Sequence, residues 1–453
     1  MRNGTNLILV LCCAMTAFAR EEFKRDFQKT VPLAAGRSFR IESSNGSLNI
    51  HTQPKGEVAI RASLRCSADT AAEAKSFCER IQIGVQESAT GVSVRTEYPS
   101  ERNHRNLGFQ VDYDITMPDT SPLDVRNRFG SVSVVNVHAP GSINNANGRV
   151  SLSGGKGRQE IEDAFGEVEV RGNDGDVSVR NGNSVVTATD ITGTVDISNR
   201  FGAVRVTNAG RGVTIRSNNS GVEVQNAGGP VVIDNSFGAV TVMDTKSDAT
   251  VRNQNGGILA RGITGTADLH TTFGQVTVSR IGKGLTVRAN NATVIGDTVG
   301  ENAAVETSFG VVDLRGVKGG AKVTSGNSSI RLNGIGGEVF AKTTFNGVTV
   351  IDAAGPITVE NQNGSVTVDA KAGQRCQPIS LHTSFGPMRV TLPSGLGYNV
   401  TAGTSFGRIH SDFEMTVSGE MSHSALTGKI GGGGCDLRLM GQNGSIDILK
   451  AAK

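Results

Sequence analysis

Residues 201–218 read FGAVRVTNAGRGVTIRSN, and residues 219–236 repeat the pattern as NSGVEVQNAGGPVVIDNS. In the first segment the apolar residues stand two apart, at Val204 and Val206 and again at Val213 and Ile215. β-Branched residues with a period of two are typical of β-strands, not of helices. The Gly, Asn, Asp and Ser residues between them tolerate turns and positive φ. Each 18-residue unit is therefore predicted to form two short strands and two turns.

The unit is repeated along most of the chain, in pairs with a period of 36 residues. One position holds a Phe in every second unit and an Asn in the units between, and a fixed period of this kind marks one structural unit copied many times. The Phe residues are Phe129, Phe165, Phe201, Phe237, Phe273, Phe309 and Phe345, and the Asn residues are Asn147, Asn183, Asn219, Asn255, Asn291, Asn327 and Asn363.

A single unit cannot bury its valines, but a stack of units can. Each strand would then bond to its equivalent in the neighbouring rung, about 4.8 Å away. The predicted fold class is all-β, a parallel β-solenoid of 18-residue rungs in 36-residue repeats. Fourteen regular rungs followed by looser ones at Phe385 and Phe406 would give a rod on the order of 75 Å long.

We expect the repeated Phe to form the structural core of the repeat. Rings on alternate rungs would lie about 9.6 Å apart, too far to stack on each other. Each Phe is therefore interpreted as an internal plug that covers two rungs, with the Asn beneath it closing a turn. On this interpretation Phe237→Ala would cost about 3–5 kcal/mol.

Composition favours a thin, turn-rich β structure. The 453 residues include 59 Gly and no Trp, and only 4% are aromatic. The net charge is +3 with both signs mixed, unlike the basic stripe of a nucleic-acid-binding protein. With three Tyr and no Trp, we also expect no aromatic platforms of the kind that hold sugar rings.

The N-terminus predicts export. Arg2, an apolar run from Leu7 to Ala14, and an Ala-x-Ala site ending at Ala19 have the features of a signal peptide over residues 1–19. A lipoprotein signal at Cys12 is the alternative, although Leu11 is a poor match to its preceding position. No later apolar run is long enough for a transmembrane segment. The expected location is the periplasm or the cell surface.

Four cysteines follow the predicted cleavage site, an even number that suits an oxidising compartment. Cys66 and Cys78 flank the one convincing helix, residues 69–80, and are predicted to pair. Cys376 and Cys435 would then form the second disulfide. A metal site is the weaker alternative, because the cysteines lack metal-ligand spacing.

The extent of the 36-residue repeat along the chain predicts the domain organisation. Residues 20–125 do not follow the repeat, and they are interpreted as a β-rich N-terminal cap carrying one short helix. Residues 126–410 form the predicted solenoid. Residues 411–453 are predicted to be C-terminal rungs and a cap, with the segment 442–448 closing the end.

Several of these motifs together resemble a known family. They are the run Tyr113 to Pro118, the serial Asn-Gly-x-Val-x-Val or Phe-Gly-x-Val-x-Val rungs, and the final segment from Asn443 to Ile448. The chain is similar over nearly its whole mature length to bacterial envelope proteins grouped as "putative adhesin, domain of unknown function". The resemblance implies an exported β-solenoid, and it implies no catalytic residues.

Candidate catalytic and metal-binding residues are few. The Ser and Asn residues before Gly are interpreted as turn formers, and the histidines are scattered. The outward column Glu160, Ser178 and Asp196 could hold two carboxylates about 9.6 Å apart, which leaves a calcium-dependent polysaccharide lyase as a minor alternative. A solvated charged face explains the same residues. We expect no catalytic residue, cofactor or metal.

The sequence therefore predicts a non-enzymatic exported protein that binds a protein or glycan at the cell envelope through an extended polar surface. Two alternatives stay open. One is a periplasmic scaffold or envelope-stress protein, and the other is a polysaccharide lyase or hydrolase on a parallel β-helix.

Overall fold

The structure is a computed structural model that describes residues 20–99, 106–371, 373, 375–418 and 422–451. The chain divides into two compact units, and the boundary falls between Val137 and His138. The predicted signal peptide, residues 1–19, lies outside the described residues. Within the described part of the chain, no helix is both long and apolar enough to cross a membrane.

The first unit is β-rich with one helix, as predicted. Antiparallel pairing joins β1 to β4, β4 to β7, and β5 to β6. In chain order its elements are β1 (Glu21–Pro32), β2 (Ser38–Glu42), β3 (Leu48–Gln53), β4 (Glu57–Ala68), α1 (Ala71–Arg80), β5 (Gln82–Ser88), β6 (Gly91–Glu97), β7 (Gly108–Pro118), β8 (Leu123–Phe129) and β9 (Val132–Val135).

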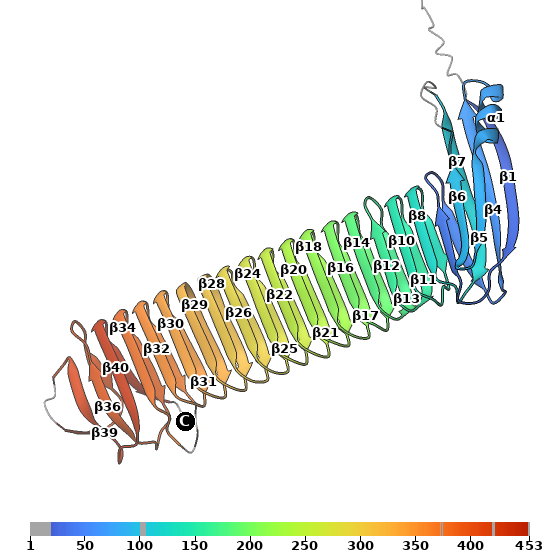
Figure 1. The fold of residues 1–453 in the computed structure, drawn as a ribbon. Coiled ribbons are helices and arrows are strands. Elements are labelled where there is room, and N and C mark those ends of the chain that lie inside the picture. Colours follow the sequence, from blue (N-terminus) through green and yellow to red (C-terminus); the bar gives the residue numbers. More distant parts are fainter. Residues whose placement is uncertain (1–19, 100–105, 372, 374, 419–421, 452–453) are drawn as a thin grey trace, which may run out of the picture. The chain divides into compact units, whose positions relative to one another are not determined.

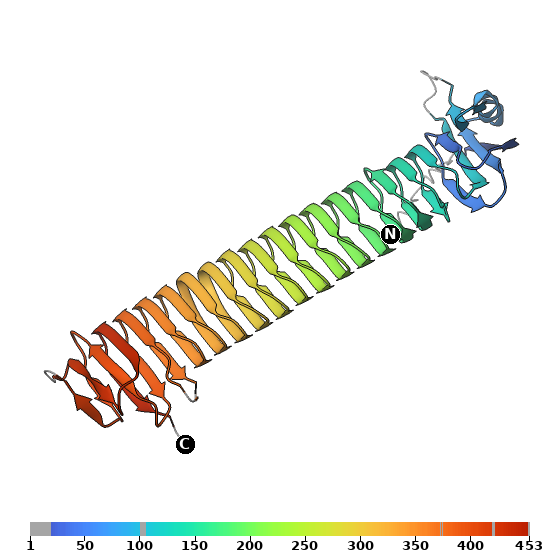
Figure 2. The ribbon, with the colours of Figure 1, turned by 60° about the horizontal axis from the view of Figure 1, so that its bottom comes forward.

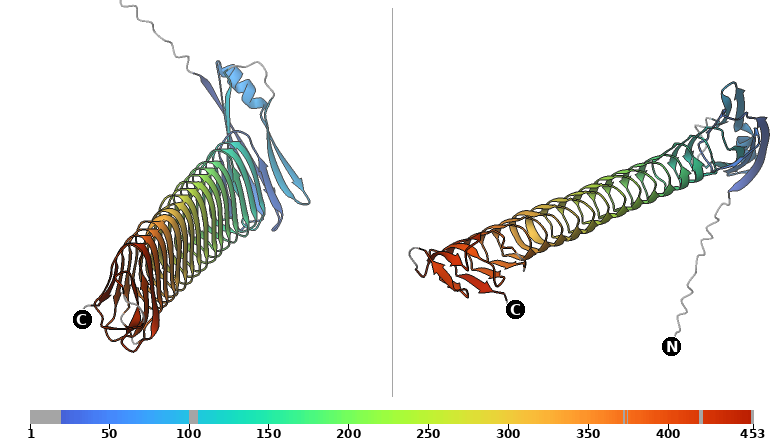
Figure 3. Two further views of the ribbon diagram at one scale, coloured as in Figure 1. Left: turned by 90° about the vertical axis from the view of Figure 1, so that its left-hand side faces the viewer. Right: turned by 90° about the horizontal axis from the view of Figure 1, so that it is seen from below.

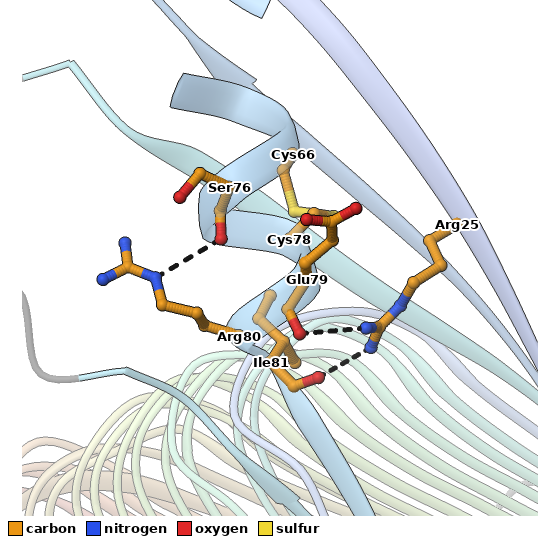
Figure 4. The surroundings of a disulfide bond; sticks show 7 residues. All are labelled: Arg25, Cys66, Ser76, Cys78, Glu79, Arg80 and Ile81. Carbon is orange, nitrogen blue, oxygen red and sulfur yellow. Dashed lines mark hydrogen bonds between the residues drawn. A yellow bond between two sulfur atoms is a disulfide. The ribbon is translucent and has the colours of Figure 1, made fainter. Parts of the chain in front are cut away.

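Helix α1 is fixed at both ends. Thr70 caps its N-terminus by accepting a hydrogen bond from the backbone amide of Glu73. The predicted disulfide between Cys66 and Cys78 joins strand β4 to the helix (Figure 4). Near the C-terminal end of the helix, the Arg25 guanidinium from β1 donates hydrogen bonds to the carbonyl oxygens of Glu79 and Ile81, at 3.2 and 2.6 Å (Figure 4).

The first unit also contains solenoid-like rungs whose spatial order differs from their chain order. Strand β2 pairs in parallel with both β6 and β8, and β3 pairs in parallel with both β7 and β9. The rung β2–β3 therefore lies between two rungs that come later in the sequence. The repeat period in the sequence did not predict this order of the rungs in space.

The second unit is the predicted parallel β-solenoid, and Figures 1 and 2 show its strands stacked in regular order from two directions. The first strands of successive rungs are β10 (Gly141–Asn147), β12 (Gln159–Asp163), β14 (Val177–Asn183), β16 (Val195–Phe201), β18 (Val213–Asn219), β20 (Val231–Phe237), β22 (Ala249–Asn255), β24 (Ala267–Phe273), β26 (Leu285–Asn291), the first halves of β28 (Ala303–Val317) and β29 (Ala321–Ile335), β30 (Val339–Phe345), β32 (Ile357–Asn363) and β34 (Ile379–Phe385). The second strands are β11 (Val150–Lys156), β13 (Val168–Asp174), β15 (Val186–Ile191), β17 (Val204–Ala209), β19 (Val222–Ala227), β21 (Val240–Thr245), β23 (Ile258–Ile263), β25 (Val276–Ile281), β27 (Val294–Val299), the second halves of β28 and β29, β31 (Val348–Ala353), β33 (Val366–Ala370) and β35 (Met388–Leu392).

The register of the stack follows the 18-residue period, so like residues lie over like residues. Val195 pairs with Val213, which pairs with Val231. These side chains are at most 1% exposed and fill the narrow interior. Seen from the side that faces left in Figure 1, the rungs lie one behind another (Figure 3). Because each valine contacts its equivalents above and below, the stack buries what a single rung would leave exposed.

The C-terminal rung is not the last one in space, which corrects the expectation that residues 442–448 close the end. Strand β40 (Cys435–Asn443) lies between β34 and β36 (Tyr398–Gly403), and β41 (Ile446–Lys450) lies between β35 and β37 (Ile409–Ser411). Antiparallel strands β39 (Ala425–Ile430) and β38 (Met415–Val417) then follow β36. The antiparallel strands cover an edge that would otherwise be open to pairing with another chain.

A disulfide holds the inserted rung in place. Cys376, in the loop between β33 and β34, is bonded to Cys435 at the start of β40. Both predicted cysteine pairs are therefore present. The second pair is separated by 59 residues, and closing a loop of that length in the unfolded chain is worth about 4 kcal/mol in the chain-entropy model.

We expect the paired substitutions Cys376→Ser and Cys435→Ser to lower the free energy of opening β40 and β41 by up to about 4 kcal/mol, because the unfolded segment regains its freedom. Hydrogen exchange resolved by segment measures this. Protection of β20 and β22 should not change, because repeats are stabilised by near neighbours. The matched control, Cys66→Ser with Cys78→Ser, should affect α1 instead. Equal loss of protection in β20 and β40 would contradict this view.

Candidate functional site

With the exception of Ala289, the residue two positions before each repeated Phe or Asn is polar and buried, and it decides how the corner of the rung is built. We call it the corner position. On β16, Val195, Ile197 and Asn199 point inward in turn, and Asn199 is 4% exposed. In the second unit the corner position is occupied by Asn145, Asp163, Asn181, Asn199, Ser217, Asn235, Asn253, Thr271, Ala289, Thr307, Ser325, Thr343, Asn361 and Thr383.

Side chains at the corner position bond to the backbone of the turn. Asn253 donates from Nδ2 to the carbonyl oxygens of Gly238 and Gly256, at 2.9 and 3.1 Å. Thr271 on the next rung donates from Oγ1 to Gly256 and to Phe273, at 3.1 and 2.9 Å. Asn253 and Thr271 thus each satisfy buried carbonyl groups of their own corner and of the rung before. Sequence reasoning missed this column, although its 18-residue period was visible.

These hydrogen bonds explain why the prediction of a Phe core was wrong. Because the corner side chain is anchored in the interior, the chain turns outward after it, and the following residues cross the edge of the rung. The Phe side chains are therefore exposed. The exposed fractions are 48% for Phe129, 62% for Phe165, 46% for Phe201, 51% for Phe237, 49% for Phe273, 50% for Phe309, 48% for Phe345, 54% for Phe385 and 76% for Phe406.

The glycine after the Phe belongs to the same corner. Gly202 has φ +104°, and a Cβ there would lie 2.2 Å from the carbonyl oxygen of Ser184 on the preceding rung. Only glycine fits this close approach, as expected from the Phe-Gly repeat. The Asn in the Phe position was expected to close the turn, but at Asn219, Asn255 and Asn291 the side chain makes no such bond within the described residues; Asn183 donates to the carbonyl oxygen of Ala164 at 3.4 Å.

The corner position should therefore matter for stability, whereas the residue in the Phe position should not. We expect Asn253→Ala to cost about 1–3 kcal/mol by leaving buried carbonyl groups unpaired. Asn253→Thr should recover most of this loss, because Thr occupies the same position at Thr271. Asn255→Ala, at the Phe position of the same rung, should change stability by less than about 0.5 kcal/mol, because the Asn255 side chain is partly exposed and makes no hydrogen bond within the described part of the protein. Thermal and denaturant unfolding of the three variants tests the assignment, which an equal loss for Asn253→Ala and Asn255→Ala would refute.

In the second unit the exposed Phe side chains form one continuous row. From Phe201 to Phe385, each pairs in register with an Asn on both neighbouring rungs, as Phe273 does with Asn255 and Asn291. We define the phenylalanine row as Phe165, Phe201, Phe237, Phe273, Phe309, Phe345, Phe385 and Phe406.

The inserted C-terminal rung preserves this alternation. Asn443 on β40 pairs with Phe385 on one side, and it forms a bridge with Phe406 on the other. Without the insertion, the two Phe rungs that follow each other in sequence would be adjacent in space. The first unit has the same alternation, since Asn45 forms a bridge with Phe129.

Between the rings, the row presents amide and hydroxyl groups. Four of the Asn rungs carry two neighbouring amides, such as Gln254 and Asn255. Ser236 and Thr272 precede the rings of the adjacent Phe rungs. Within the described residues the amide side chains have no hydrogen-bond partner in the protein; they are Asn218, Asn219, Gln254, Asn255, Asn290, Asn291, Gln362 and Asn363.

A charged column runs beside the row, three residues before each Phe or Asn. On the Asn rungs it holds Arg216, Arg252 and Arg288, again with a period of 36 residues. Arg252 lies 3.8 Å from Asp234, and Arg288 lies 3.2 Å from Asp268. Open depressions lie between this column and the amides, and one is lined by Arg216, Asp234, Ser236, Arg252, Gln254, His270 and Thr272, among others.

The predicted outward column of Glu160, Ser178 and Asp196 is present in register. Its carboxylates are engaged with arginines: Glu160 accepts a hydrogen bond from Arg158 at 2.8 Å, and Asp196 lies 3.6 Å from Arg216. Among the described residues, no group of three or more His, Cys, Asp or Glu side chains could hold a metal ion.

One corner position holds an acid in place of an amide. Asp163 is 3% exposed, and burial raises the pKa of its carboxyl to about 6, although the nearby backbone amides of Gly166 and Ala164 oppose the shift. The native state therefore binds a proton more tightly than the unfolded chain, whose carboxyl has a pKa near 3.8. The free energy of unfolding falls as the pH rises between these two values, by up to about 3 kcal/mol.

We expect Asp163→Asn to raise the melting temperature at pH 7.5 and to have little effect near pH 3.5, where the acid is protonated in both states. Asn fits the position, because Asn145 and Asn181 occupy it on the adjacent rungs. Calorimetry of both proteins across this pH range measures the difference. If the difference in melting temperature between the two proteins does not change with pH, the ionisation of the Asp163 carboxyl is not its cause.

Comparison with known proteins adds little to this description. No protein-family model matches the sequence, and no functionally curated protein matches it. A crystal structure of "a putative cell adhesion protein from Clostridium sporogenes" matches with 8% identity and a TM-score of 0.16, over 95% of this chain and 100% of the other. At that TM-score the two chains do not superpose as wholes, so the match carries no argument about function.

Proposed function

We propose that this chain is an exported, non-enzymatic protein of the cell envelope that acts as an adhesin. The observation that carries the proposal is the phenylalanine row. Single exposed apolar residues are normal on a protein surface, whereas exposed apolar residues gathered on one face mark sites of interaction. A row repeated along a solenoid provides many equivalent contacts, so that weak single contacts can add up to firm attachment.

Two further observations support export and surface binding. Both cysteine pairs form disulfides, which persist in oxidising compartments outside the cytoplasm. The bacterial adhesin-type family that the sequence resembles also consists of exported proteins, which implies the same compartment. The charges that line the rod are largely paired with each other, as in Arg205 with Glu223 at 3.0 Å and Lys342 with Glu360 at 2.9 Å. The exposed rings are therefore the more distinctive feature of the surface.

Protease shaving of intact bacteria tests the location. In cells that produce the full chain, an antibody against the solenoid should bind before permeabilisation, and external protease should remove the signal while a periplasmic marker survives. The purified protein, digested alongside, controls for intrinsic resistance of the solenoid. Binding that appears only after the outer barrier is breached would overturn the adhesin role and favour a periplasmic scaffold.

A further inference from the structure

We infer that the phenylalanine row is a binding site for an extended β-1,4-linked glycan chain, with one ring for each disaccharide. This inference deepens the proposed function and rests on it. The expectation that the protein lacks aromatic platforms for sugars followed from its three Tyr and its lack of Trp, and it took no account of Phe rings on the surface. Since the rings are exposed, that objection no longer holds.

The spacing of the rings carries the argument. Equivalent residues on adjacent rungs lie about 4.8 Å apart, so rings on alternate rungs lie about 9.6 Å apart. An extended β-1,4-linked chain turns each sugar over relative to the last, and the same face returns once per disaccharide, after a similar length. Several successive rings can therefore contact the same face of every second sugar.

The groups between the rings fit the sugars between the stacked ones. Asn255 and Asn291 flank Phe273, and their amides have no partner within the described protein. An amide offers both donors and an acceptor, which suits sugar hydroxyls. The apolar face of one sugar and the hydroxyl groups of the next would thus meet a ring and an amide in turn.

The same groups argue against a second copy of this chain as the occupant. Two rods joined along their rows with the rings interdigitated would place Phe rings over the free amides. A buried amide without a hydrogen-bond partner costs free energy, and a facing ring offers it only a weak one. Glycan hydroxyls would satisfy these amides.

The inserted C-terminal rung supplies independent support. In chain order the rungs of Phe385 and Phe406 follow each other directly. Instead Asn443 lies between them, and the spacing of one ring per two rungs is maintained to the end of the row. The spacing is therefore preserved where the order of the sequence alone would have broken it.

The test uses purified full-length mature protein and soluble oligosaccharides of increasing length. Calorimetric affinity should rise with each added disaccharide in the cello- and chito-oligosaccharide series. It should stay negligible for malto-oligosaccharides, whose α-1,4 linkage coils the chain. No binding to either β-linked series at millimolar concentration, or binding without dependence on length, would overturn the inference.

Matched variants locate the site. Replacing Phe237, Phe273 and Phe309 together by Ala should weaken binding of the longest oligosaccharide by about tenfold or more. Because these rings are half-exposed, the triple variant should remain folded, which circular dichroism checks. Phe340→Ala is the control, since Phe340 is a solenoid Phe outside the row, beside Lys322. Equal affinity in the triple variant and in Phe340→Ala would overturn the assignment.

Further readouts separate this inference from the proposed function. If the triple variant loses attachment of cells but the wild type binds no β-linked glycan, the adhesin role stands and the glycan is the wrong ligand. If the wild type self-associates in sedimentation and the triple variant does not, the row joins two copies and the inference fails. Shortening of bound oligosaccharides would support the site while overturning the non-enzymatic role.

Discussion

Parallel pairing between residues 18 positions apart is the constraint on which this structure depends. Each strand of the second unit takes its hydrogen bonds from the equivalent strands above and below, as β20 does from β18 and β22. A rung by itself has neither a core nor a ladder, so every rung is stabilised by its neighbours. The same pairing aligns the side chains in columns. Whether one position in the repeat is buried or exposed, and which side chain it carries, is therefore repeated along a whole edge of the solenoid.

The corner position determines which of the aligned side chains lie on the surface. A small polar side chain is buried there and bonds to the carbonyl groups of the turn, as Asn199 does to Ser184 and Gly202 at 3.0 and 2.6 Å. The hydrogen bonds fix the point at which the chain leaves the interior, so the next residue but one lies on the outside. A Phe in that place cannot help the core. Its regular recurrence is thus better explained by binding than by folding.

Both units use the same arrangement to end a stack of rungs. In the first unit β2–β3 lies between rungs that follow it in the chain, and in the second β40–β41 lies between rungs that precede it. Antiparallel strands then cover the outer strands, and each unit carries one disulfide. The long sequence separations in these contacts make the ends costly to assemble, and the covalent bonds offset part of that entropy.

The sequence by itself determined the class of fold, the 18-residue rung, the single helix and the two cysteine pairs, because local periodicity and turn chemistry specify strands, and repetition specifies their stacking. It did not determine on which side of the backbone the repeated Phe lies. Val204 alternates clearly with its neighbours, but Phe201 stands at a corner, where the period of two is interrupted and inward and outward can no longer be assigned. Nor did it determine that Asn443 separates Phe385 from Phe406, because that contact joins segments far apart in the chain. Only the tertiary structure, through the buried hydrogen bonds of the corner position and the insertion of the last rung, decided that the rings form a row on the surface.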